Sequence, residues 1–339
     1  MQSNSVPKDV PTQTNLIRKK RVTEPNPVNQ RTPQSPKSNF SNRFKKGLKQ
    51  WKDVFPFIIL GLIGAGVFVI YPLIKGIIMS FQDYNIMPGA ESPFVGIENY
   101  KEAFQDETFR YAVRNTILNT IVTVPINWFL GLFFACLINL HFIKFKVTFR
   151  TLYYLPVITS WIVVAFLFRY LFADGENGII NFIFLHLGLI DKPISWLQNQ
   201  WTAMVVVWLF HIWKTVGWSV VIYLAALQGI PKNLYEAAAI DGANGIKSFI
   251  HITIPMLRPI TAFVVINLIM GAFNIFPQVY FLTNGGPMGQ TEVLQSMIYK
   301  EAFNNFNFGY SSALSVMMGI VIFLITWTQQ KRLSNQGNI

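Results

Sequence analysis

The chain has 339 residues, of which 52% are hydrophobic and 13% are charged, and its mean hydropathy is +0.36. This composition is too apolar for an average soluble domain and indicates a protein that crosses a membrane several times. The net charge of +12 does not indicate nucleic-acid binding, because 12 of the 28 Lys and Arg residues precede Asp53 and most others lie in short loops on one side of the predicted spans.

The N-terminal part of the chain is polar and basic. Residues 1–39 are rich in Pro, Ser, Asn, Gln and Thr and cannot bury enough apolar surface to fold, which predicts a disordered tail. The segment is too long and too polar for a signal peptide. In residues 40–53 apolar and cationic side chains alternate with helical spacing, which predicts an amphipathic helix on the membrane surface in contact with lipid.

Six segments are long and apolar enough to cross about 30 Å of hydrocarbon. They lie near 54–80, 113–139, 151–173, 202–228, 259–282 and 309–329. We therefore expect an all-α membrane protein with six transmembrane helices. These helices form one transmembrane domain over residues 54–330, and a short tail, 331–339, follows it.

The loops between these segments differ in charge. Loops 82–112 and 174–201 are acidic, whereas loop 140–150 carries Lys and Arg and no acid. Because basic loops stay on the cytoplasmic side, both termini and the segment 229–258 are expected in the cytoplasm. The protein is expected to be a multi-pass component of the cytoplasmic (inner) membrane.

A polar hairpin, residues 232–256, separates the fourth and fifth predicted spans. Its Ala-rich first half favours a helix, Gly242 a turn, and residues 246–254 a second short helix that Pro255 stops. Such a hairpin suits the transmission of force to a soluble partner, although an ordinary loop with two interfacial helices would have the same pattern. The residues expected to couple it to a partner are Glu236, Ala237, Ala238, Asp241, Gly242, Ile252 and Pro255.

Polar residues recur on one helix face in two predicted spans, where polar groups are costly and usually face a partner or a cavity. They are His211, Lys214, Thr215 and Trp218 in the fourth span, and Asn267, Gly271, Asn274 and Gln278 in the fifth. An indole can cover the apolar face of a sugar while amides bridge its hydroxyl groups, so these stripes are candidates for the pathway of a neutral polyol. The alternative is that they only join helices by hydrogen bonds. Lys214 would either attract an anionic substrate or pair with backbone carbonyls.

Several chemistries have no motif in the sequence. There is no GxxxxGK[ST] loop, so the chain is not expected to bind or hydrolyse ATP and is not expected to be an enzyme. The single cysteine, Cys136, and four scattered histidines give no metal site and no intrachain disulfide. The predicted spans also lack the paired carboxylates that carry protons or sodium. No cofactor bound by the chain is expected.

The hairpin resembles the E-A-A-x3-G-x9-I-x-L-P motif of the permease subunits of ABC importers, with Ile254 in place of the usual Leu. Other segments are similar to the carbohydrate-uptake permeases of the maltose, lactose and glycerol-3-phosphate type. These segments are Arg150–Pro156, Ile194–Leu197, Trp213–Gly217, Leu227–Pro231, Leu282–Pro287 and Phe308–Leu314. Together they extend the resemblance over roughly residues 54–330.

The resemblance implies a type I importer permease fold and a set of partners. These are a second permease subunit in a heterodimer, an ATPase dimer that binds ATP and Mg at the cytoplasmic face, an extracellular or periplasmic solute-binding protein, and a sugar. In the maltose-type subunit the positions that contact substrate align with His211, Lys214, Thr215, Trp218, Gly271, Ala272 and Ile275. The second polar stripe agrees with that set only at Gly271.

The sequence thus predicts the permease subunit of an ATP-driven importer of a sugar or related polyol. An ion- or proton-coupled secondary carrier acting without an ATPase is the alternative, and the lack of carboxylates in the spans argues against it. A membrane receptor or scaffold would leave the polar stripes without a role. The sequence does not specify which sugar is carried.

Overall fold

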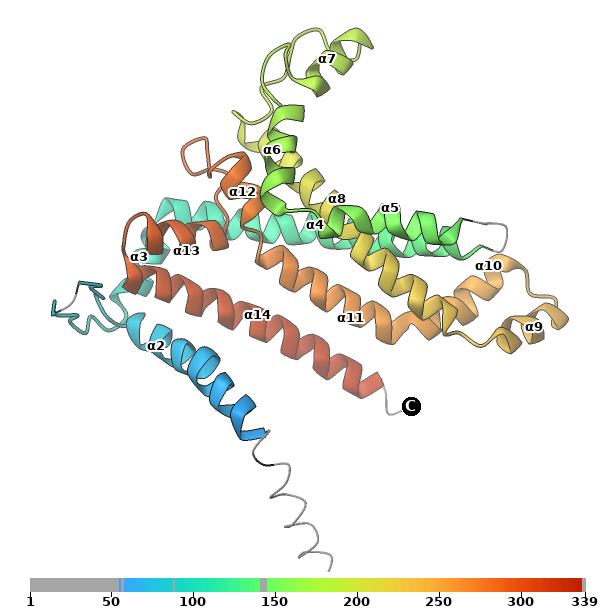
Figure 1. The fold of residues 1–339 in the computed structure, drawn as a ribbon, viewed down its shortest axis with the longest axis horizontal. Helices are drawn as coiled ribbons and strands as arrows, with labels where there is room; N and C mark the ends of the chain where they lie inside the picture. The colour runs from blue at the N-terminus through green and yellow to red at the C-terminus, as the bar shows by residue number, and fades with distance from the viewer. Residues whose placement is uncertain (1–54, 56–57, 88, 141–144, 337–339) are drawn as a thin grey trace, which may run out of the picture. The chain divides into compact units, whose positions relative to one another are not determined.

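The computed structural model describes residues 55, 58–87, 89–140 and 145–336, and these residues are mostly helical (Figure 1). The chain divides into two units, Met1–Gly64 and Ala65–Ile339, and the second contains every site discussed below. Within the described ranges there is no β-strand, only an isolated bridge between Gln82 and Phe94. The predicted tail and amphipathic helix, 1–39 and 40–53, lie outside the described residues.

The apolar helices follow the predicted spans. In the described part of the chain, five helices are long and apolar enough to cross a membrane, and a bent pair of helices meets the same test. The five are Ile58–Met79, Glu107–Asn139 (α4), Gln200–Gln228 (α8), Gly245–Phe273 and Phe308–Lys331, and the pair is Lys146–Ile158 (α5) with Trp161–Leu171 (α6). An all-α, multi-pass membrane protein is confirmed, with six spans when the bent pair counts as one.

The remaining elements are shorter or are parts of the long helices. They are η1 (Gly66–Ile70), α2 (Tyr71–Met79), α3 (Glu98–Gln105), α7 (Ile179–His186), α9 (Lys232–Ile240), α10 (Gly245–Ser248), η2 (Phe249–Thr253), α11 (Ile254–Phe273), α12 (Pro277–Leu282), α13 (Leu294–Phe303) and α14 (Phe308–Gln336). α4 begins before the predicted residue 113 because the Asp106 carboxylate caps it, accepting the Thr108 N–H at 2.7 Å.

The third span is bent, which the sequence prediction of one segment over 151–173 missed. The axes of α5 and α6 differ by 93°. Thr159 and Ser160 between them have extended backbone, with ψ of 153° and 132°. Pro156 in the last turn of α5 cannot donate to the helix and weakens it just before this point. The crossing therefore consists of two helices joined at a sharp corner.

The fifth span was predicted at 259–282, and the helix at this place begins earlier, at Gly245, and ends earlier, at Phe273. One continuous helix runs from Gly245 to Phe273, so Pro255 does not stop the second arm of the hairpin. A π-turn, η2, precedes that proline, and such a widened turn lets a helix continue past a residue without an N–H. The far end stops early because Pro277 cannot donate to Phe273 and disfavours helical backbone at the residue before it.

Helix α8 is at the centre of the packing, against α4, α5 and α11. Its core with α4 and α11 contains Tyr223 and Leu224, both almost fully buried. Two glycines bring the helices together: a Cβ on Gly131 would lie 2.5 Å from the Ser219 Cβ, and one on Gly217 only 1.8 Å from the Tyr153 carbonyl oxygen. The small residue at 131 thus serves packing inside one chain.

Candidate functional site

The hairpin between α8 and α11 turns at Gly242, which has a φ of +77°. The Gly242 N–H donates to the Ala239 carbonyl at 3.1 Å, and the Ala243 N–H donates to the Ala238 carbonyl at 2.8 Å. This pair of bonds is a Schellman motif, which satisfies the last carbonyls of α9 and requires left-handed backbone at the glycine. The predicted turn is therefore confirmed, together with its physical cause.

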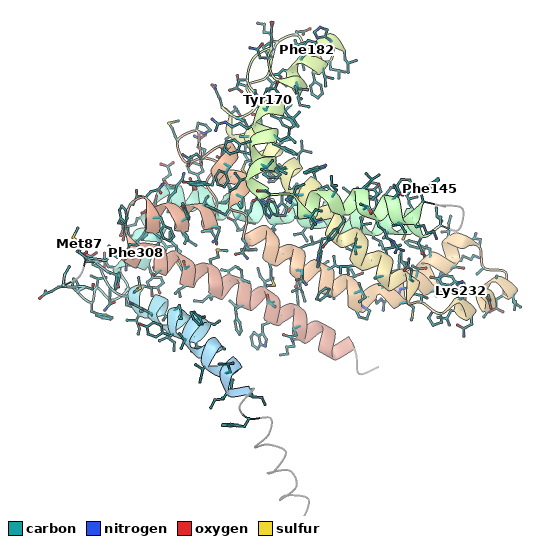
Figure 2. All side chains as sticks on the ribbon, viewed as in Figure 1. Met87, Phe145, Tyr170, Phe182, Lys232 and Phe308 are labelled. Atoms are coloured by element: carbon teal, nitrogen blue, oxygen red, sulfur yellow. The ribbon has the colours of Figure 1, made fainter. Side chains whose placement is uncertain are left out.

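Two side-chain contacts fix the second arm of the hairpin relative to the first. The side-chain Oδ1 atom of Asn244 accepts the Lys247 N–H at 2.9 Å and caps α10. Tyr235 on α9 and Thr253 in η2 are joined through their hydroxyl groups at 2.8 Å. Because η2 continues directly into α11, the second arm of the hairpin and the fifth span form one continuous helix, to which the Tyr235 hydroxyl ties the first arm. Lys232 in Figure 2 marks the start of the hairpin.

The coupling residues predicted from the sequence divide into two groups. Glu236, Ala237, Asp241 and Gly242 are exposed. By contrast, Ile252 packs against the core of α4, α8 and α11, and Ala238 and Pro255 are half-buried. The exposed face also presents Ile240, 87% accessible, and Ile246, 72% accessible, which the sequence analysis did not single out. Apolar side chains exposed to this degree on a polar hairpin are typical of a docking surface.

The polar stripes of the fourth and fifth spans border a cavity of about 290 Å³. Its lining residues come from the α5–α6 corner, α8 and α11: Val157, Trp161, His211, Lys214, Thr215, Trp218, Asn267, Leu268 and Gly271. All four predicted residues of the fourth span and two of the fifth thus meet at one place. Trp161 was not predicted, since its position on the cavity wall depends on the bend.

Asn274 and Gln278 do not share the helix face on which the sequence placed them, because α11 ends at Phe273. The Asn274 side chain is exposed and its amide donates to the Met270 carbonyl at 2.8 Å. Gln278 lies on α12, buried, with its Nε2 atom 3.0 Å from His211 Nδ1. Gln278 therefore contacts the cavity residue His211 without lining the cavity, whereas Asn274 neither lines the cavity nor contacts His211.

Two of the positions implied by the maltose-type resemblance are also away from the cavity. Ala272 and Ile275 are buried in separate apolar cores, 0% and 1% accessible. Thr215, by contrast, lines the cavity and donates its hydroxyl at 2.7 Å to the His211 carbonyl. The resemblance is thus supported geometrically for the fourth span and for Gly271 only.

Lys214 is only 1% accessible, although it is charged and lies within a span. Its ammonium group donates to the carbonyls of Pro156 and Thr159, to the Val157 carbonyl at 3.2 Å and to the Thr159 hydroxyl at 3.2 Å. The sequence left open whether Lys214 attracts an anionic substrate or pairs with backbone carbonyls. In the structure it pairs with backbone carbonyls.

A third polar row, along α4, escaped the sequence analysis. Asn115, Asn119, Thr123 and Asn127 are completely buried and recur every four residues, a spacing visible in the sequence. Asn115 donates to the Gln290 and Glu292 carbonyls at 2.7 and 2.8 Å, and Asn119 to the Ala272 carbonyl at 2.9 Å. Asn127 accepts the Thr215 hydroxyl at 3.2 Å. The row joins α4 to the cavity helices and to the loop before α13.

The loop after α12 contains a second buried charge, and this one lies outside the spans. Glu292, 2% accessible, pairs with Lys300 at 2.7 Å, and Lys300 also donates to the Asn284 carbonyl at 2.7 Å. Nearby on α13, burial raises the pKa of the Glu301 carboxyl, and the negative charges of Asp106, Glu102 and Glu292 raise it further against the lowering effect of a hydrogen bond from Asn305. This loop is thus fixed against α13 by the ion pair and against α4 by the hydrogen bonds of Asn115.

Comparison with known proteins accounts for this combination of hairpin and cavity. Residues 115–331 match the family model described as "Binding-protein-dependent transport system inner membrane component". The chain belongs to this family. The matched region begins at the first residue of the α4 polar row and includes the cavity and the hairpin, so the resemblance to importer permeases is confirmed. A component of such a transport system is a transporter subunit and not an enzyme.

Curated relatives of this inner membrane component extend over most of its length. It is 34% identical over 281 residues to the arabinooligosaccharides transport system permease protein AraP of Halalkalibacterium halodurans, covering 82% of this chain and 87% of the relative. It is 30% identical to the lactose transport system permease protein LacF of Rhizobium radiobacter, covering 84% and 96%. A bacterial ABC transporter involved in the import of the acidic polysaccharide alginate has the same fold, with a TM-score of 0.76, 21% identity and coverage of 86% and 98%.

Proposed function

We propose that this chain is the permease subunit of an ABC importer that carries a sugar through the cavity between α8, α11 and the α5–α6 corner. The observation that supports this most is the lining itself, in which the indole residues Trp161 and Trp218 share one cavity with Asn267 and Thr215. Aromatic faces with amides and hydroxyls are the groups that bind sugar rings. Relatives named for arabinooligosaccharides and lactose support the same substrate class.

The partners in this proposal are a second permease subunit, an ATPase dimer that binds ATP and Mg, and a solute-binding protein on the outer side. The ATPase dimer would dock on the exposed face of the hairpin, where Glu236, Ile240 and Ile246 are accessible. The hairpin continues into the helix that carries Asn267 and Gly271, so a displacement of its docked end reaches the cavity wall directly. This is an alternating-access switch biased by the nucleotide state of the partner.

An ion- or proton-coupled carrier fits these observations less well. The family is binding-protein-dependent, and none of the residues that line the cavity is a carboxylate. A carrier that couples to protons or sodium needs a titratable or coordinating acid in its pathway.

The proposed orientation predicts opposite labelling of two exposed positions. In a Cys136→Ser background, Glu102→Cys should react with an impermeant thiol reagent in intact cells, because its loop lies outside. Lys247→Cys on the hairpin should react only after permeabilisation. Labelling of Lys247→Cys in intact cells would reverse the orientation and remove the argument for an ATPase at the hairpin.

The cavity itself is tested by a matched pair of asparagines on the fifth span. Asn267 lines the cavity, whereas Asn274 is exposed away from it, and both amides donate to the carbonyl four residues earlier at 2.8 Å. Asn267→Ala should weaken sugar uptake by about 1–3 kcal/mol, which is roughly 5- to 150-fold in apparent affinity. Asn274→Ala should leave uptake unchanged.

The measurement is the concentration dependence of uptake of radiolabelled arabinotriose and lactose, normalised to the amount of membrane-inserted permease. Trp218→Ala should behave as Asn267→Ala does, because a stacked indole is lost. Equal effects of Asn267→Ala and Asn274→Ala, or none from either, would show that the polar residues only hold helices together.

A further inference from the structure

The corner between α5 and α6 leaves backbone groups that must be satisfied inside a membrane span. The last carbonyls of an α-helix have no partner within the helix, and there is no water in hydrocarbon to donate a hydrogen bond to them. Here the helix ends at Ile158, and the chain turns through 93° before α6 starts at Trp161. A corner at this depth therefore needs a hydrogen-bond donor from another element.

Lys214 of α8 is that donor. Its ammonium group has three protons to donate and lies within hydrogen-bond distance of the carbonyls of Pro156, Val157 and Thr159, at the end of α5 and in the corner, and of the Thr159 hydroxyl. The C-terminal end of a helix is also the negative end of its dipole, so a cation is favoured there. The donors of Lys214 are thus occupied by backbone carbonyls and are not available to an anion.

The same ammonium group holds an aromatic wall of the cavity. The Lys214 Nζ atom lies 4.9 Å from the ring centroid of Trp161, the first residue of α6, within the range of a cation–π contact. Trp161 also packs against Phe210 of α8, with ring centroids 5.9 Å apart. The place of this indole in the cavity thus depends on the corner and on Lys214 together.

We propose that Lys214 is a positioning residue for transport: it fixes the α5–α6 corner, and through it Trp161, so that the cavity accepts a neutral sugar ring. The proposal rests on the proposed function and adds the charge class of the substrate. The cavity lining contains one basic side chain that is occupied by carbonyls, and one histidine, His211, whose Nδ1 atom is held by Gln278 at 3.0 Å. It offers no unoccupied cation to a uronic acid carboxylate.

The test uses the complete importer with its binding protein and ATPase, reconstituted in vesicles. The probes are neutral arabinotriose and acidic digalacturonate, and the variants are Lys214→Met, Lys214→Arg, Trp161→Ala and the double variant Lys214→Met/Trp161→Ala. For each, the KM and maximal rate are measured per assembled complex. Lys214→Met should raise the KM for arabinotriose at least tenfold. Lys214→Arg, which keeps the donors and the charge, should have a KM close to that of the wild type.

The double variant should be no worse than Trp161→Ala, because both substitutions disturb the same indole. Two results would overturn the proposal. One is a Lys214→Met variant that assembles less well but has an unchanged KM, since that is a purely structural role. The other is a selective loss of digalacturonate uptake in Lys214→Met, since the lysine would then bind the substrate's carboxylate.

A second readout needs no substrate. Val157 lines the cavity at the corner and is half-buried. In a Cys136→Ser background, Val157→Cys should react with a small thiol reagent at least tenfold faster when Lys214 is also replaced by Met, and not when it is replaced by Arg. If the wild-type importer moves no sugar, the proposed function fails, while this rate still decides whether Lys214 fixes the corner. An unchanged rate would overturn the positioning role even in a working sugar importer.

Discussion

Gly217→Ala is expected to prevent this chain from forming its helix bundle, although it adds a single methyl group. The new Cβ would lie 1.8 Å from the Tyr153 carbonyl oxygen and 2.8 Å from its carbonyl carbon. These are backbone atoms of α5, which cannot turn aside as the end of a long side chain can. Overpacking usually costs about 1–3 kcal/mol, and a clash between two helix backbones belongs at the upper end of that range or above it.

The measurement is the yield and thermal stability of monodisperse protein in detergent. The matched control is Gly271→Ala, also in a spanning helix, where a Cβ has nothing within 4 Å among the described residues. That control should be as stable as the wild type or more so, because alanine favours a helix over glycine by up to about 1 kcal/mol. If Gly217→Ala yields stable protein, the close approach of α5 and α8 is not a feature of the folded state.

Hydropathy was sufficient to find the spans because each long apolar run has only one way to satisfy its backbone in a membrane. It could not find where a span bends or stops, since that depends on local backbone chemistry. Pro277 ended a helix inside the predicted fifth span, and Thr159 and Ser160 made a corner inside the third. Conversely, Pro255 was predicted to end a helix that continues through it.

The candidate site was predictable to the extent that it depends on one helix. The face of α8 with His211, Lys214, Thr215 and Trp218 follows from spacing alone and lines the cavity as a set. Trp161 lines the cavity only because the chain bends between α5 and α6. The pairing of Gln278 with His211 joins residues that are 67 positions apart in the sequence. Such contacts are set by the packing of helices against each other, which periodicity within one helix does not contain.

Gly242 is expected to show a graded dependence on the side chain placed there, which would identify the turn as the coupling element. Its φ of +77° lies in the left-handed region, where a residue other than glycine costs about 1–2 kcal/mol. Asparagine tolerates this region, alanine does so less well, and a β-branched residue least. A Cβ at this position would meet no described atom within 4 Å, so the cost is conformational and not a clash.

Gly242→Asn should therefore transport almost as the wild type does, Gly242→Ala should be intermediate, and Gly242→Val should lose most sugar-stimulated ATP hydrolysis. The reason is that the Schellman bonds at Ala238 and Ala239 hold the end of α9, and losing them would move Glu236 and Ile240 away from the proposed ATPase surface. Gly245→Ala is the matched control, because that glycine also has open space around it but no positive φ.

The experiment purifies the importer complex with each variant and measures the bound ATPase together with hydrolysis stimulated by the sugar-loaded binding protein. Membrane insertion should be equal in all variants, since Gly242 precedes the spanning helix Gly245–Phe273 and Gly245 is its first residue. Equal stimulation in the Asn, Ala and Val variants would make the hairpin a passive connection between α8 and α11. A loss in Gly245→Ala as large as that in Gly242→Ala would show that any side chain in this loop disturbs docking, whatever the backbone conformation.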